Sequence, residues 1–254
     1  MFIILLYLLI VSLLLQYLLF IPAFLFKTDK LTDLSYSLSF VLLSLLTIYF
    51  NKLSIVKLIL FLMILFWALR LGGFLLYRVL KLGKDVRFDN IRNSFSKFFV
   101  FWTLQGISVF IILLNSFFIF LNPESKFKFF SIIGMLIWLI GFIIEGISDI
   151  QKFKFKQKNK DVWINEGFWK YSRHPNYFGE MLCWIGIFVY SFFYLNTMYV
   201  VYSLISPLFI MFLLLFVSGI PTLEKKYDDK FKDNPDYLRY KQKTNLLFPI
   251  KLKK

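Results

Sequence analysis

Cysteine and histidine are nearly absent from this sequence. Its 254 residues include one cysteine, Cys183, and one histidine, His174. A single cysteine has no partner within the chain, so no internal disulfide framework organises the fold. Metal sites need several convergent ligands, so one imidazole excludes the multi-histidine di-iron centres of membrane desaturases and hydroxylases and argues against a structural zinc site. We therefore expect no metal site.

Acidic residues are scarce, and a glycine-rich nucleotide-binding loop is absent from the sequence. The chain has 15 Asp and Glu against 30 Lys and Arg, a formal net charge of +15, and contains no G-x-G-x-x-G, so nothing favours a Rossmann domain. Most of the cations lie in three polar segments, 78–97, 152–177 and 222–254, which alternate with apolar runs. This pattern is typical of the cytoplasmic side of a membrane protein, and it suits anionic lipid headgroups or a phosphorylated cofactor. We expect membrane lipids among the partners and no nucleic acid; the sequence leaves the oligomeric state open.

What the sequence has in abundance is long apolar runs. Hydrophobic residues make up 59% of the chain, and its mean hydropathy is +0.68. The runs match the roughly 20 residues that cross a bilayer, and no alternating pattern indicates a barrel, so the backbone must be satisfied within helices. The sequence predicts an all-α integral membrane protein of about seven transmembrane helices, at residues 2–26, 34–50, 58–80, 98–121, 129–150, 175–194 and 198–217.

The charge pattern also predicts the orientation of these helices. Seven spans with the basic segments on one side put the N-terminus outside and the C-terminus in the cytoplasm. Residues 2–26 lack the basic start of a cleaved signal peptide, so we expect a retained span, and residues 222–254 predict an amphipathic helix on the membrane surface. We divide the chain into two N-terminal transmembrane helices (1–57) and a membrane domain with cytoplasmic loops and the amphipathic tail (58–254). The expected location is the inner (cytoplasmic) membrane of a bacterium.

Polar residues concentrate between residues 141 and 186. Glu145 and Asp149, four residues apart and hence on one helix face, lie near the end of one apolar run, and Glu180 lies near the start of the next. A carboxylate at membrane depth is costly unless it faces a partner or a polar cavity, so these acids are functional candidates. Between the runs stands Arg-His-Pro-Asn-Tyr at 173–177. The stretch predicts a polar site at a membrane surface.

Two interpretations of this site remain open from the residues alone. Pro175 suits the first turn of a helix, whose free amides up to Phe178, together with Arg173, would bind an anion such as a pyrophosphate. The plainer alternative makes Asp149 and Glu180 structural ion-pair partners of cations such as Arg173.

The stretch 169–180, WKYSRHPNYFGE, resembles the signature of a membrane family grouped with the steroid 5-alpha-reductase C-terminal domain. Further similarity lies in WALRLGGFLLYRVLKLGKDVRFDNIR at 67–92, in the Ser-Asp ending of an apolar run within 141–156, and in GIPTLEKKY and PDYLRYKQKT within 218–249. The resemblance thus covers most of the chain after about residue 65.

The resemblance implies a seven-helix, membrane-embedded oxidoreductase that binds NADPH from the cytoplasmic side. Such an enzyme, of the 3-oxo-5-alpha-steroid 4-dehydrogenase type, acts on a CH–CH group by reducing a carbon–carbon double bond conjugated to a carbonyl, here in a lipid-like or steroid-like substrate. Steroid reductases use a glutamate and a tyrosine near that carbonyl. The first four apolar runs contain no matching glutamate, so Glu145 is the nearest substitute, and Tyr77 is a loose match for the tyrosine. The matching motif positions and the polar cluster imply these cofactor-binding residues: Asp149, Lys156, Arg173, His174, Asn176, Tyr177, Glu180, Tyr227 and Arg239.

The short motif Arg-His-Pro-x-Tyr is also shared with isoprenylcysteine carboxyl methyltransferases and related membrane enzymes, which bind S-adenosylmethionine. An S-adenosylmethionine-dependent membrane methyltransferase is therefore an alternative, and so is a non-enzymatic membrane protein that kept the fold. The Ser148-Asp149 ending of the fifth apolar run favours the reductase.

Overall fold

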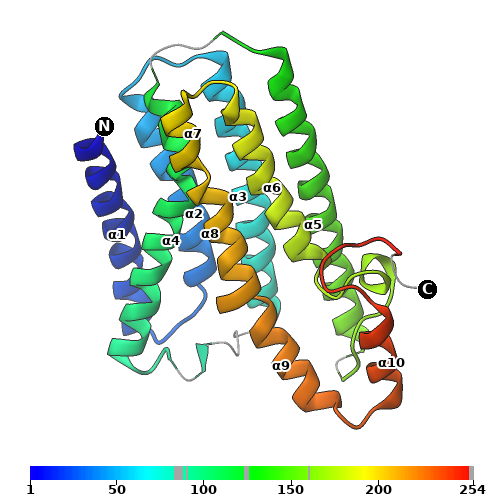
Figure 1. The fold of residues 1–254 in the computed structure, drawn as a ribbon. Helices are drawn as coiled ribbons and strands as arrows, with labels where there is room; N and C mark the ends of the chain where they lie inside the picture. The colour runs from blue at the N-terminus through cyan, green and yellow to red at the C-terminus, as the bar shows by residue number, and fades with distance from the viewer. Residues whose placement is uncertain (83–87, 90, 123–125, 160, 252–254) are drawn as a thin grey trace. The chain divides into compact units, whose positions relative to one another are not determined.

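Helices account for almost all of the regular structure. The structure is a computed structural model that describes residues 1–82, 88–89, 91–122, 126–159 and 161–251. Among these residues the only β pairing is an isolated bridge between Ser172 and Asn245. The helices (Figure 1) are α1 (Phe2–Leu25), α2 (Thr32–Tyr49), α3 (Ile55–Leu82), α4 (Phe95–Leu121), α5 (Ile132–Lys158), α6 (Pro175–Phe192), α7 (Thr197–Ser203), α8 (Ile205–Phe212), α9 (Ile220–Phe231) and α10 (Pro235–Lys243).

Six helical stretches in the described part of the chain are long and apolar enough to cross a membrane. They are α1 to α4, α5 with the short turn before it, and the run Thr197–Phe231, which contains α7, α8 and α9. The predicted all-α class is confirmed, and the fold suits an integral membrane protein. The predicted sixth span forms as α6 but is not one of the six, because its start carries polar residues such as Asn176 and Glu180. A total of seven spans and their orientation therefore stay predictions.

Most helix ends lie within a few residues of the predictions, and the larger differences are at the end of α5 and in the tail. α5 continues beyond its predicted end at residue 150 as far as Lys158, and its last turn carries Lys156 and Lys158, where positive charge is favourable. The tail forms two helices instead of one amphipathic helix. Its break lies before Pro235, which begins α10, and the Asn234 side chain caps that helix by accepting from the amides of Asp236 and Tyr237.

The helices group into two compact units. Unit 1 comprises Met1–Ser131 and Ser191–Ser206, and unit 2 comprises Ile132–Tyr190 and Pro207–Lys254. The boundaries fall at the start of α5, near the end of α6 and within α8, and the division that the sequence analysis placed at residue 57 lies inside unit 1.

A buried polar network joins α1, α2 and α4 in unit 1. Gln105 Nε2 donates to Gln16 Oε1 at 2.8 Å and to Ser35 Oγ at 2.9 Å, and Gln16 Nε2 donates to Ser39 Oγ at 2.8 Å. Hydrogen bonds of this kind tie helices together where lipid offers no alternative partner. An aromatic cluster packs in the same unit, formed by Phe20, Ala23, Phe88, Phe98 and Trp102.

Glycine brings α5 and α6 of unit 2 into backbone contact. A Cβ on Gly141 would lie 2.6 Å from the carbonyl oxygen of Gly179, and one on Gly179 would lie 2.5 Å from the amide nitrogen of Glu145. Gly134 and Gly186 face one another in the same way, since a Cβ on Gly134 would lie 2.6 Å from the Gly186 carbonyl oxygen. Small residues allow such close approach between membrane helices. The contact holds Glu145 against α6.

Candidate functional site

The segment between α5 and α6 is fixed to the end of α5. Gly167 adopts a positive φ of 59°, and a Cβ there would meet the Gln151 side chain. The Phe168 amide donates to Gln151 Oε1 at 3.1 Å, and Trp169 Nε1 donates to the Ser148 carbonyl oxygen at 3.0 Å. These contacts set the position from which the chain enters the Arg-His-Pro-Asn-Tyr stretch.

The C-terminal segment holds this stretch from the other side. The Arg173 amide donates to the Asn245 carbonyl oxygen at 2.9 Å, and the His174 amide donates to that of Leu246 at 3.1 Å. Both bonds adjoin the bridge between Ser172 and Asn245. Residues distant in sequence thus fix the backbone of Arg173 and His174.

α6 begins at Pro175, as the sequence predicted. The Phe178 amide, however, donates to the His174 carbonyl oxygen at 3.1 Å, so it is not free to bind an anion as expected. The expected anion site therefore loses one of its three amide donors, the other two being those of Asn176 and Tyr177.

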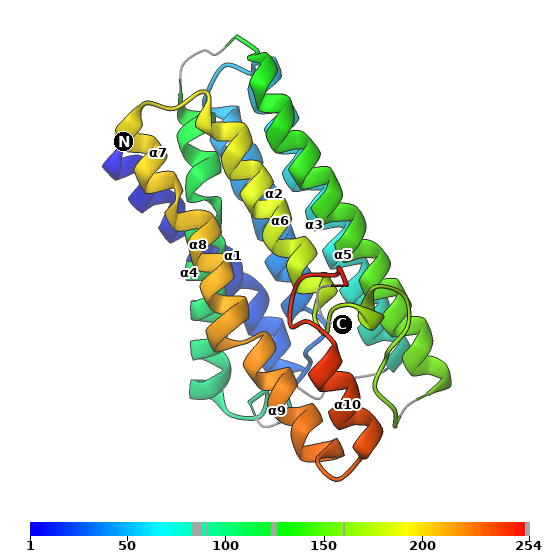
Figure 2. The same ribbon diagram turned by 45° about the vertical axis from the view of Figure 1, so that its right-hand side comes forward.

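Glu224 on α9 connects the two side chains that precede Pro175. Its Oε2 accepts from Arg173 Nη1 at 2.6 Å, and its Oε1 lies 2.7 Å from His174 Nε2. Lys241 Nζ lies 3.6 Å from Glu224 Oε2 and donates to both Asp228 carboxylate oxygens at 2.5 and 2.6 Å. Hydrogen bonds between charged groups are stronger than neutral ones, so this cluster is a firm attachment between α6, α9 and α10. Figure 2 shows α10 lying beside α9.

His174 is buried, with 2% of its surface exposed. Burial lowers its pKa below 6.5, and this effect outweighs the hydrogen bond to Glu224, which acts in the opposite direction. A neutral imidazole that bonds a carboxylate through Nε2 carries its proton there, so Nδ1 is an acceptor. Its ring stacks on that of Tyr177, with centroids 5.7 Å apart.

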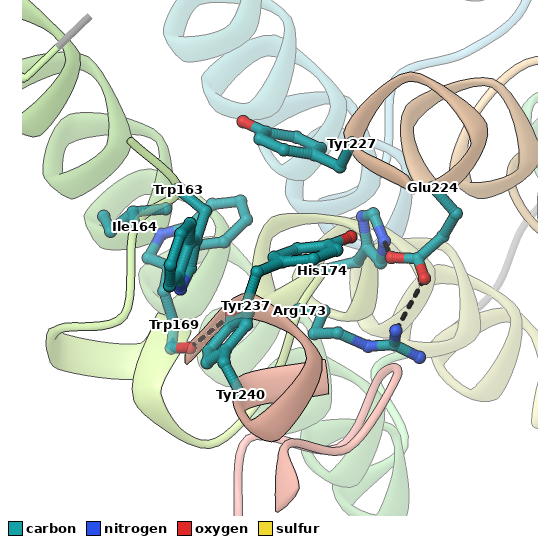
Figure 3. A pocket seen from close by; sticks show the side chains of 9 residues that line it. All are labelled: Trp163, Ile164, Trp169, Arg173, His174, Glu224, Tyr227, Tyr237 and Tyr240. Atoms are coloured by element: carbon teal, nitrogen blue, oxygen red, sulfur yellow. Dashed lines mark hydrogen bonds and ion pairs between the residues drawn. The ribbon is translucent and has the colours of Figure 1, made fainter. Parts of the chain in front are cut away.

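An aromatic pocket surrounds this cluster (Figure 3). Trp163 packs against Tyr237 at 5.4 Å and Tyr240 at 6.3 Å between ring centroids, and Tyr240 Oη donates to the Trp169 carbonyl oxygen at 2.8 Å. Burial raises the pKa of the Tyr237 and Tyr240 phenols, so both remain hydrogen-bond donors near neutral pH. The pocket is narrow: its cavity measures about 20 Å³, within about 330 Å³ of space that includes open solvent. Its lining consists of Trp163, Ile164, Trp169, Arg173, His174, Glu224, Tyr227, Tyr237 and Tyr240.

Three buried polar atoms of the lining have no hydrogen-bond partner among the described residues. They are two donors, Trp163 Nε1 and Arg173 Nε, and one acceptor, His174 Nδ1. Buried polar groups are nearly always hydrogen-bonded, and leaving one unsatisfied costs about 1–3 kcal/mol. Their presence in one pocket favours a binding site for a ligand with polar atoms.

Cations lie beside the pocket. Lys156 Nζ is 5.5 Å from the centroid of the Tyr227 ring, and Lys152 Nζ is 4.5 Å from that of Trp169. Lys230 on α9 pairs with Asp161 at 2.7 Å. Because Arg173 and Lys230 already pair with carboxylates, the attraction for an anionic ligand comes mainly from Lys152 and Lys156.

Several residues that the sequence analysis assigned to a cofactor site meet at this pocket. Arg173, His174 and Tyr227 line it. Tyr177 stacks on His174, and Lys156 lies over the Tyr227 ring.

Other predicted site residues lie outside the lining. Asn176 Nδ2 donates to Asp149 Oδ1 at 3.2 Å between α6 and α5, and Asn176 Oδ1 is buried without a partner among the described residues. Glu180 lies further along α6 and is partly buried. Arg239 has 68% of its side chain exposed and pairs with Asp236 on its own helix at 3.7 Å, so the structure does not bring it to the pocket.

The two predicted catalytic residues belong to different units. Glu145 on α5 is 2% exposed, and its Oε2 lies 3.9 Å from Cys183 Sγ on α6. Tyr77 on α3 of unit 1 is 52% exposed.

Arg173 pairs with an acid that sequence reasoning did not consider. Asp149 and Glu180 were the expected ion-pair partners, but the structure gives this role to Glu224, with Lys241 nearby. Both lie in the tail that was assigned to the membrane surface. The four-residue spacing of Glu224 and Asp228 places both acids on one face of α9, but it does not indicate that Arg173 is their partner.

The structure shows an all-α protein with candidate membrane spans and a pocket built around the Arg-His-Pro-Asn-Tyr stretch. Residues 19–244 match the model of a family described as "Protein of unknown function (DUF1295)". The chain belongs to this family. No curated protein and no solved structure matches it. The family description names no activity, so the link to steroid 5-alpha-reductases stays a hypothesis.

Proposed function

We propose that this protein is a membrane-embedded, NADPH-dependent reductase of a carbon–carbon double bond conjugated to a carbonyl in a lipid-like substrate. The observation that carries the proposal is the pocket at Arg173, His174 and Glu224, where three buried polar atoms have no partner within the described residues. The resemblance of the stretch at 169–180 to steroid 5-alpha-reductases supplies the reaction class.

The pocket residues fit one part of a nucleotide cofactor. Aromatic rings suit the stacking of a base, Arg173 and the nearby lysines suit phosphate, and the three unsatisfied atoms suit a polar ring edge. NADPH as a whole is larger than the pocket, so much of it would lie outside. Asp149 and Asn176, which bond each other between α5 and α6, offer polar groups for that remainder.

The residues of the chain have separate roles in this proposal. Bound NADPH would supply a hydride. Glu145, held between α5 and α6, would donate or hold a proton for the substrate, and Tyr77 is the second candidate for that task. The apolar helices would exclude water and admit a lipid-like substrate from the bilayer.

The proposal includes a topology. Seven spans with the three basic segments in the cytoplasm would place the pocket on the side where NADPH is present, in the inner membrane of a bacterium. α6 would be the additional span beyond the six identified by length and composition.

A second candidate function is methyl transfer from S-adenosylmethionine. It is favoured by the aromatic walls next to Glu224, because aromatic faces and carboxylates attract a sulfonium cation. The shared Arg-His-Pro-x-Tyr motif fits this reading as well.

The two functions are separated by titrating the purified full-length protein with NADPH, NADH and S-adenosylmethionine, following nicotinamide fluorescence and thermal stability. We expect saturable NADPH binding, weaker NADH binding and no stabilisation by S-adenosylmethionine. Binding of S-adenosylmethionine alone would favour the methyltransferase. Binding of none of the three would favour a non-enzymatic protein.

Variants locate the binding. Asp149→Ala and Asn176→Ala should each weaken NADPH binding by about 1–3 kcal/mol, the range for losing a partner in a buried site. Arg173→Ala should weaken it more than Lys156→Ala, because a guanidinium fixes a phosphate through directed hydrogen bonds. Glu166→Gln, at an exposed position of the same loop, is the matched control.

A further inference from the structure

We propose that the aromatic pocket recognises the amino-bearing edge of adenine and that His174 Nδ1 is the acceptor that selects it. This inference rests on the proposed function and names the part of the cofactor that the pocket takes. It follows from the contacts of one imidazole and the chemistry of the atoms around it.

The contacts of Glu224 determine which ring nitrogen of His174 carries the proton. Glu224 accepts from Arg173 at 2.6 Å and has Lys241 Nζ at 3.6 Å, so two cations hold it as a carboxylate. A carboxylate only accepts hydrogen bonds, and its other oxygen lies 2.7 Å from His174 Nε2. The proton of the neutral ring therefore resides on Nε2.

The other ring nitrogen of His174, Nδ1, is the acceptor. Nδ1 then has a lone pair and no proton, it is buried, and it has no partner among the described residues. The cations near the ring, Arg173 and Lys152, and the burial itself disfavour a second proton. A ligand must therefore present a donor at this position, and a ligand with an acceptor there would be rejected.

The same lining also contains two donors without a partner among the described residues. Arg173 Nε and Trp163 Nε1 require acceptors from the ligand. Adenine offers an amino donor next to a ring-nitrogen acceptor on one edge, whereas a 6-oxo purine has an oxygen acceptor where adenine has the amino group. The one acceptor and the two donors of the pocket thus suit the amino group and the ring nitrogens of adenine, and not its 6-oxo analogue.

The walls of the pocket and their place in the fold also suit adenine. Trp163 packs edge-to-face against Tyr237 and at a tilt against Tyr240, and these rings form an aromatic surface of the kind on which bases stack. The walls come from the α5–α6 connection and the polar helices α9 and α10, whereas reaction with a lipid requires the nicotinamide near the apolar helices. Lys156, over the Tyr227 ring, is positioned for a phosphate on the adenosine. These features assign the pocket to adenine and not to the nicotinamide carboxamide.

The test compares the affinity of the full-length protein for NADPH with that for its hypoxanthine analogue, in which an oxygen replaces the adenine amino group. Wild-type protein should bind NADPH at least about tenfold more tightly, because the oxygen of the analogue would leave the buried His174 Nδ1 unpaired. His174→Gln retains a polar group near the Nε2 position for Glu224 but has no acceptor at the Nδ1 position. We expect its preference to fall to within about threefold, with weaker NADPH binding. His174→Asn places a polar group near the Nδ1 position and should keep more of the preference.

A second measurement needs no variant. Adenosine 2′-monophosphate and inosine 2′-monophosphate should displace NADPH from wild-type protein with the same order of preference. Equal affinity for the two purines in wild type would overturn the inference while leaving NADPH binding intact, and so would an undiminished preference in His174→Gln. Failure of wild type to bind NADPH at all would instead overturn the proposed function, and this inference with it.

Discussion

At the scale of single residues, the pocket depends on one carboxylate that serves several partners. Glu224 is 18% exposed and accepts from Arg173 and His174, while Lys241 lies near it and bonds Asp228. Because the groups it neutralises are themselves partly buried, its removal leaves them without compensation.

Replacing this carboxylate should therefore weaken the fold. We expect Glu224→Ala to lower the free energy of unfolding by about 2 kcal/mol, in the range for hydrogen bonds to charged groups. Thermal unfolding in detergent or nanodiscs measures the change. Glu166→Gln, exposed in the same unit, should stay within about 0.5 kcal/mol of wild type. Equal unfolding temperatures for both variants would contradict the assignment of Glu224 as the central contact.

His174 should make stability depend on pH. Burial lowers its pKa in the folded state, while in the unfolded chain it is about 6.5, so between these values the unfolded state binds more protons. Stability is then fully present above about pH 6.5 and is lost as the pH falls toward the folded-state pKa. Unfolding temperatures recorded between roughly pH 5 and pH 8 should fall on acidification.

The chain has a single histidine, which provides the control. His174→Asn should flatten this part of the profile, since carboxylates titrate at lower pH. Parallel profiles for wild type and the variant would show that His174 is not the titrating group.

The sequence identified only part of the site at this scale. The polar composition of residues 173–177 and the rarity of acids in apolar runs were sufficient to select Arg173, His174 and Asp149. The contact of Arg173 with Glu224 spans 51 residues, and nothing in local spacing indicates it. The tyrosines of α10 that line the pocket were hidden for the same reason, because their inward face becomes apparent only once the helix is placed.

At the scale of elements, the close packing of α5 against α6 depends on glycines, which have no side chain. Gly141 and Gly179 leave no space for a methyl group between the helices, and Gly134 and Gly186 repeat this contact. This close packing is what holds Glu145 and the Asp149–Asn176 bond in place.

A methyl group at this contact should separate the helices. Gly141→Ala should lower the free energy of unfolding by about 1–3 kcal/mol, the usual effect of overpacking, and should also weaken NADPH binding. Gly73→Ala on α3 is the matched control, because nothing lies within 4 Å of the added methyl group. That substitution should be neutral or stabilise by up to about 1 kcal/mol. Similar effects of the two substitutions would mean that α5 and α6 do not pack through glycine.

Helix positions were largely predictable at this scale because long apolar runs in a bilayer leave little alternative to helix. Ends were less so. α5 extends through Lys156 because lysine is a good helix former and favourable near a helix C-terminus, which hydropathy does not register. The two tail helices are separated by the Asn234 cap, a local signal that was present in the sequence.

At the scale of the whole molecule, the proposed topology places all three basic segments on the same side of the membrane. Reporter fusions after Leu121 and after Lys254 should lie on opposite sides, outside and inside respectively, because three predicted spans lie between these two positions. A reporter inserted at Asn196 should lie outside, since α6 must then cross the membrane. The same location for the Asn196 reporter and the C-terminus would contradict the seven-span topology.

The central claim is that the pocket at Arg173, His174 and Glu224 binds the adenosine end of NADPH. Photolabelling of the full-length protein with an azidoadenine derivative of NADPH, followed by peptide mass spectrometry, tests it without altering the fold. The account predicts labelled peptides that contain Trp163 or the tyrosines of α9 and α10, with labelling abolished by excess NADPH. Labelling that is competed by NADPH but confined to peptides from α1 to α4 would contradict it.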